Sequence, residues 1–107
     1  MKNNPTGSPQ LGAALALVDL LKEHPELAVA SWSIDSVTGS LHGFVHDESS
    51  GAVEVYAEVL GAEVVKGLPY AFEGRTVYPY RLSTVWRDVR VSMAATVPLT
   101  ALMGRAA

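Results

Sequence analysis

Hydrophobic and polar residues alternate along residues 76–98 in a pattern that predicts a β-hairpin. With Arg87 and Asp88 as a two-residue tip, nearly every large apolar side chain falls on one face, and the other face is mostly polar or small. Burial of the apolar face therefore fixes the register. Because tight hairpin turns prefer Asn-Gly or Asp-Gly, a wider tip is the alternative. The predicted pairs on the apolar face are Trp86 with Val89, Thr84 with Val91, Leu82 with Met93, Tyr80 with Ala95 and Tyr78 with Val97.

Residues 29–35 and 41–46 alternate in the same way and predict a second hairpin, which turns at Gly39. In the register that gives this hairpin a coherent apolar face, Gly43 lies opposite Trp32 and leaves room for the indole ring. The predicted pairs are Ile34 with Leu41, Trp32 with Gly43 and Ala30 with Val45.

Two other segments, residues 8–23 and residues 50–64, have the spacing of amphipathic helices. The first begins with Ser8, a favourable N-cap residue. The second is ambiguous because residues 53–55 alternate like a strand, but helical spacing fits the longer window. We expect residues 68–75, which follow the second helix, to form a loop.

The resulting order of helix, strand, strand, helix, strand, strand predicts an α+β fold made of two α-β-β units. We expect a four-stranded antiparallel sheet with two helices packed on one face, and Pro79 at a sheet edge or bulge. Residues 8–98 form the single predicted domain, after a disordered N-terminal tail at residues 1–7. Residues 99–107 form a C-terminal tail, for which a short helical turn and a frayed end are the alternatives.

The composition narrows the classes of function. The chain has 107 residues, of which 49% are hydrophobic and 18% charged, which is enough for one hydrophobic core. A formal net charge of −3 and only eight scattered basic residues argue against binding to nucleic acid. The absence of cysteine fits a reducing cytoplasm, and no apolar run is long enough to span a membrane. The polar residues between positions 19 and 25 interrupt the one segment that resembles a signal peptide, so we expect a cytoplasmic protein without membrane partners.

Three short runs resemble a known pattern: Leu-His-Gly-Phe-Val-His at residues 41–46, Leu-Gly-Ala-Glu-Val at residues 60–64 and Trp-Arg-Asp-Val-Arg-Val at residues 86–91. The chain resembles small, mostly uncharacterised actinobacterial proteins that are often encoded by phages or mobile elements. This resemblance covers residues 32–98. Its motifs are structural, so it implies a host context and no particular activity.

Residues that could carry chemistry do not form a catalytic or metal-binding pattern. His42 and His46 share one face of a strand but stand about 13 Å apart, at roughly 3.3 Å per residue, which is too far to hold one ion. Ser49 lies close to His46 in the chain, but its position suits helix capping better than a hydrolase triad. We therefore expect no metal, no cofactor and no enzymatic activity. A solvated helix face or a docking patch for a basic partner would explain the acidic residues Asp47, Glu48, Glu54, Glu58 and Glu63.

The first predicted helix has more apolar surface than one sheet face can cover. One apolar stripe on this helix consists of Leu11, Ala14, Leu15, Val18 and Leu21, and the next consists of Ala13, Leu17 and Leu20. We therefore expect a small non-enzymatic protein-protein interaction module that forms a homodimer, through the first helix or the exposed sheet face, or binds another protein. The candidate interface residues are Leu17, Leu20, Phe44, His42, His46, Val85 and Arg90.

The alternative function is small-ligand binding, or a minor enzymatic activity, in the predicted loop. Tyr70 and Phe72 are aromatic residues that core packing does not readily explain in a loop. Together with Arg75 they could line a small pocket or an interface.

Overall fold

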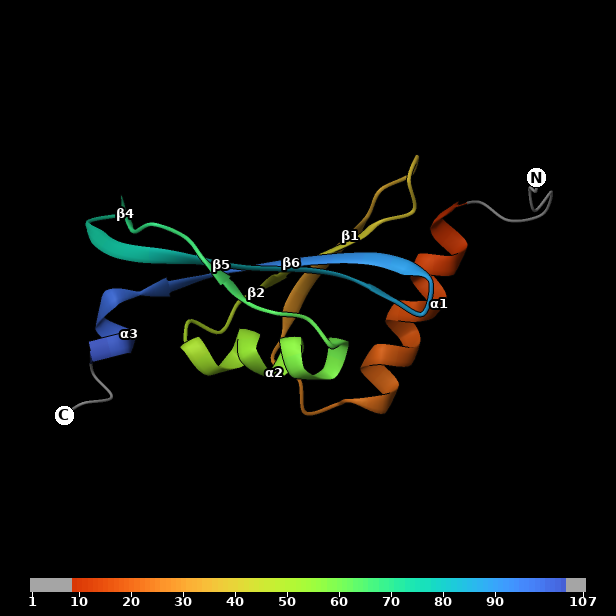
Figure 1. The fold of residues 1–107 in the computed structure, drawn as a ribbon, viewed down its shortest axis with the longest axis horizontal. Coiled ribbons are helices and arrows are strands. Elements are labelled where there is room, and N and C mark those ends of the chain that lie inside the picture. The colour runs from red at the N-terminus through yellow and green to blue at the C-terminus, as the bar shows by residue number, and fades with distance from the viewer. Residues whose placement is uncertain (1–8, 104–107) are drawn as a thin grey trace.

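The computed structural model describes residues 9–103 as a mixed sheet with helices packed against it (Figure 1). The predicted tail at residues 1–7, the predicted cap at Ser8 and residues 104–107 lie outside the described residues. The elements are α1 (Pro9–Glu23), β1 (Ala30–Ile34), β2 (Leu41–Val45), α2 (Ser50–Leu60), β3 (Val65–Lys66), β4 (Tyr70–Phe72), β5 (Arg75–Trp86), β6 (Val89–Pro98) and α3 (Leu99–Met103).

The strands form a six-stranded sheet in the order β1-β2-β6-β5-β3, with β4 also paired to β5. The predicted α+β class is confirmed. The sheet has six strands and not four, and it is not wholly antiparallel, because β2 and β6 are parallel neighbours. The chain crosses from β2 through α2 and enters the sheet again at its far side, so that β6 lies between β2 and β5. This places β6, whose inward residues are all buried, at the centre of the sheet, where apolar strands are stabilised most.

Both predicted hairpin registers are confirmed. In the β5-β6 hairpin Trp86 pairs with Val89 and the remaining pairs follow as predicted, and in the β1-β2 hairpin Trp32 pairs with Gly43. The tip of the β5-β6 hairpin consists of only Arg87 and Asp88, both at positive φ, 53° and 65°. These angles are typical of a primed two-residue turn, so the alternative of a wider tip is wrong.

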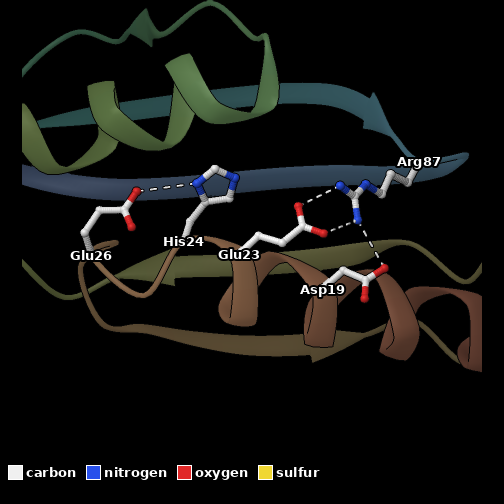
Figure 2. A network of polar contacts seen from close by, with 5 residues as sticks. All are labelled: Asp19, Glu23, His24, Glu26 and Arg87. Atoms are coloured by element: carbon white, nitrogen blue, oxygen red, sulfur yellow. Dashed lines mark hydrogen bonds and ion pairs between the residues drawn. The ribbon is translucent and has the colours of Figure 1, made fainter.

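A bulky residue at positive φ is uncommon, and the surroundings of Arg87 help to explain why the turn is tolerated. The guanidinium lies 4.3 Å from the centre of the Trp86 ring. It also donates hydrogen bonds to Asp19 and Glu23 of α1, as Figure 2 shows. The side chain of Arg87 thus attaches the hairpin tip to the C-terminal half of α1.

Both long helices contribute to one hydrophobic core. Leu20 of α1 and Tyr56 of α2 are almost completely buried, together with the inward residues of β6 such as Val91. Helix α2 ends at Leu60 and not at residue 64, because Gly61 adopts a left-handed conformation (φ 72°) and caps the helix through its N–H.

The short strands β3 and β4 lie on the outer side of β5, so the segment predicted as a loop at residues 68–75 contains β4 and the first residue of β5. Pro79 explains why they are two strands: its carbonyl oxygen accepts a hydrogen bond from Gly67 at 2.7 Å, so its nitrogen also faces this side. β3 pairs with β5 as far as Tyr80, and β4 starts pairing at Val77. Pro79 therefore lies at the gap between β3 and β4. No strand residue there needs a hydrogen bond from the N–H that proline lacks. The tail predicted at residues 99–107 includes the short helix α3.

Candidate functional site

A hollow of about 300 Å³ lies on the sheet face that α1 and α2 leave open. Tyr70, Phe72 and Arg75, the three residues of the predicted pocket, all line it. So do Phe44 and His46, which were predicted as interface residues. We call this site the aromatic hollow; within residues 9–103 its lining residues are Phe44, Val45, His46, Glu48, Tyr70, Phe72, Arg75 and Thr96.

The walls of the aromatic hollow come from strands that are not neighbours. Phe44 lies on β2, Tyr70 and Phe72 lie on β4, and β6 and β5 run between these two strands. Three strand spacings separate the walls, about 14 Å along a flat sheet, and Thr96 of β6 lies between them. The three aromatic side chains are between 43% and 47% exposed, so each retains a large free ring surface. The imidazole of His46 packs edge-on against Phe44, with 5.6 Å between ring centres.

An ion pair between Arg75 and Glu48 also lines the aromatic hollow. The two groups meet in a bidentate arrangement, with distances of 2.9 Å from Nη2 to Oε2 and 3.3 Å from Nη1 to Oε1. The hydrogen bonds from Arg75, followed by its positive charge, lower the pKa of Glu48, and the same contacts raise the pKa of Arg75. Both side chains are about half exposed, so we expect the pair to orient two polar groups at the hollow and to contribute little to stability.

The two predicted interface histidines have separate serine partners. His46 Nε2 lies 2.6 Å from Ser31 Oγ, and His42 Nδ1 lies 2.6 Å from Ser92 Oγ. These contacts hold the rings apart on the open sheet face. Within residues 9–103 there is no group of three or more histidine, aspartate or glutamate residues arranged to hold a metal ion.

Helix α1 turns one of its two apolar stripes to the sheet and exposes the other. Its buried residues are Ala13, Ala16 and Leu20, and Leu17 is partly buried against the same core. The prediction that Leu20 belongs to an interface is therefore wrong, because its side chain is completely buried. The small side chains of Ala13 and Ala16 allow the helix backbone to approach the sheet closely. The exposed stripe, which we call the leucine stripe, consists of Leu11, Leu15, Val18 and Leu21, each between 46% and 57% exposed.

Two acidic residues of α1 pair with the same arginine within the chain (Figure 2). Asp19 Oδ2 lies 3.1 Å from Arg87 Nη1, and Glu23 accepts two hydrogen bonds from the same guanidinium at 2.7 Å and 2.9 Å. These hydrogen bonds lower the pKa of Glu23 and raise that of Arg87. Lys22 is the remaining charged residue of the helix.

The predicted interface residues do not form a single surface. Val85 and Arg90 face each other across the β5-β6 hairpin, near its tip, and both are exposed. They line a hollow separate from the aromatic one, together with residues around Gly39. Leu17 packs against the core on the helix-covered side of the sheet, whereas Phe44, His42 and His46 belong to the open side.

Sequence reasoning missed Glu48 and Thr96 as lining residues. Glu48 precedes α2, and an acidic residue at this position is already explained by the positive N-terminus of a helix. Nothing in the local sequence therefore marks Glu48 as a lining residue. Thr96 reaches the hollow only because β6 lies beside β2 in parallel, and local alternation gives no signal for that pairing.

Comparison with known proteins leaves the family open: no protein-family model, no curated protein and no solved structure matches this chain. Among the described residues, no helix has the length and apolar character needed to cross a membrane.

Proposed function

We propose that this protein is a small non-enzymatic interaction module that forms a homodimer through the leucine stripe of α1. The observation that carries the proposal is the exposure of four large aliphatic side chains in line on one helix. Contiguous apolar patches of this kind on soluble proteins often mark interaction sites. Covering them on both copies would bury several hundred Å² of apolar surface, which favours association.

The spacing of the leucine stripe suits helix-helix pairing. Leu11, Leu15 and Val18 follow one another at intervals of four and three residues, the spacing of a coiled-coil seam. A two-fold axis near the middle of α1 would pair Leu15 with Val18 of the second copy in an antiparallel arrangement. One patch then serves both partners, as a closed dimer requires.

The charges beside the leucine stripe favour a second copy of this chain over a strongly charged partner. Asp19 and Glu23 share the single positive charge of Arg87 in the same chain, and Lys22 supplies a second positive charge, so the charges around α1 balance and two α1 helices can approach with little net repulsion. A basic partner would have to compete with Arg87 for these carboxylates. Lys22 continues the same spacing in the last turn of α1, and its long side chain can extend past the end of the contact into water.

The proposal is tested by a charge placed at the centre of the leucine stripe. Leu15→Glu should shift the protein to monomer, because dimerisation would then bury an unpaired carboxylate from each copy against the apolar Val18 of the other copy. Val55→Glu is the matched control, since Val55 is an exposed aliphatic residue on α2, outside the stripe. Light scattering during size-exclusion chromatography at about 50 µM should give a dimer for the wild type and the control and a monomer for Leu15→Glu. Dissociation of both variants, or of neither, would contradict the assignment of the interface to α1.

A further inference from the structure

We propose that the aromatic hollow binds a free small molecule, a neutral aromatic ring that carries an N–H or O–H donor. This site lies on the sheet face opposite the core-packed helices and uses none of the leucine stripe, so it is independent of the proposed dimer.

The size of the hollow sets an upper limit on the ligand. Its volume of about 300 Å³ is at the small end of ligand sites, which commonly span roughly 300–1,000 Å³. A space of this size is large enough for one ring or a fused pair of rings.

The aromatic side chains favour a flat apolar ligand. Phe44, Tyr70 and Phe72 line the hollow from two opposite sides, and each is close to half exposed. A planar ring inserted among them can make offset or edge-to-face contacts, which aromatic groups prefer, and it removes apolar surface from water.

The Arg75–Glu48 pair favours a neutral ligand. Its two charges cancel in a bidentate arrangement. A carboxylate would have to compete with Glu48 for the guanidinium, and an ammonium group would have to compete with Arg75 for the carboxylate. A neutral ring leaves the ion pair intact, so it binds without displacing either Glu48 or Arg75 from its partner.

The same pair explains the requirement for a donor on the ring. Each oxygen of a carboxylate has two acceptor positions, and the hydrogen bonds to Arg75 use one on each oxygen of Glu48. The remaining positions can accept an indole N–H or a phenol O–H without disturbing the ion pair.

Indole is a suitable probe for the full-length protein, titrated while amide resonances are followed by two-dimensional NMR. We expect saturable shifts in β2, β4 and Thr96, with a Kd of about 0.1–2 mM, the range expected for a ligand of this size. Binding of 1-methylindole, which lacks the donor, should be at least about fivefold weaker, as should binding of benzoate and benzylamine. Phe72→Ala should weaken indole binding about tenfold, whereas Val85→Ala, an exposed aliphatic residue outside the hollow, should leave it unchanged.

Several results would overturn this proposal. They are the absence of saturable shifts up to about 10 mM indole, equal binding of indole and 1-methylindole, equal or tighter binding of a charged probe, or shifts confined to other parts of the chain. Tighter binding of N-acetyltryptophanamide than of indole would assign the hollow to a protein side chain and overturn the free-ligand proposal. The titration is repeated with Leu15→Glu, where indole binding should persist at the same affinity, so a failure of dimerisation cannot be mistaken for a failure of this site.

Discussion

A methyl group added at Gly43 tests how closely β2 packs against Trp32. The Cβ of an alanine there would lie 2.7 Å from Trp32 Cζ3 and 2.9 Å from Met93 Cε. The methionine tip is flexible and can move away. The indole ring is restricted, because it packs edge-on against Tyr56 with 6.1 Å between ring centres, so Trp32 determines the penalty.

The expected magnitude follows from two opposing terms. Overpacking of a core typically destabilises by about 1–3 kcal/mol, whereas replacing glycine with alanine within a strand recovers roughly 0.5–1 kcal/mol. We therefore expect Gly43→Ala to lower the free energy of unfolding by about 1–2 kcal/mol in urea titrations followed by circular dichroism. Gly51→Ala is the control, because a Cβ at this helical position meets no atom within 4 Å; its stability should be unchanged or up to about 1 kcal/mol higher.

A double-mutant cycle identifies the responsible neighbour. If Trp32 causes the penalty, Gly43→Ala should be much less destabilising in a Trp32→Leu background than in the wild type. An undiminished penalty in that background, or a Gly43→Ala variant as stable as the wild type, would refute the packing argument.

Two further predictions concern hydrogen bonds of the helices. Tyr56→Phe should lower the free energy of unfolding by about 1–2 kcal/mol, because the tyrosine hydroxyl donates a hydrogen bond to the carbonyl oxygen of Ala28 and phenylalanine cannot. A urea titration that shows no loss of stability would contradict this role. The lowered pKa of Glu23 predicts a stabilising contribution that is complete above the ordinary value of 4.5 and is lost as the pH falls through the folded-state pKa. Melting temperatures measured from about pH 6 down to pH 3 should therefore fall more steeply for the wild type than for Arg87→Ala, and parallel curves would rule out this contribution.

The sequence predicted the two hairpins well because their information is local. Alternation with a period of two allows only one register that gathers the large apolar residues on one face, and the opposition of Trp32 and Gly43 followed from it. The insertion of β6 beside β2 was not predictable in this way. Strand order depends on how whole hairpins pack around α2, and an alternating pattern has the same form in a parallel and an antiparallel pair.

The candidate sites show the same division between local and tertiary information. Aromatic residues at positions 70 and 72 were recognised because they are unusual in a loop, although they belong to a strand. The helical wheel of α1 revealed surplus apolar surface but not which stripe faces the sheet, so Leu20 was assigned to the wrong side. Ala13 and Ala16 were the available signal, since small residues permit the closest approach of a helix to a sheet.

Self-association through α1 is the central claim, and sedimentation equilibrium of the unmodified protein over a concentration series tests it most directly. We expect the average mass to rise towards twice the chain mass of 11.4 kDa as the concentration passes through the micromolar range. We also expect Leu15→Glu to remain at the mass of a single chain under the same conditions. A wild-type protein that stays at 11.4 kDa up to about 100 µM would contradict the proposal.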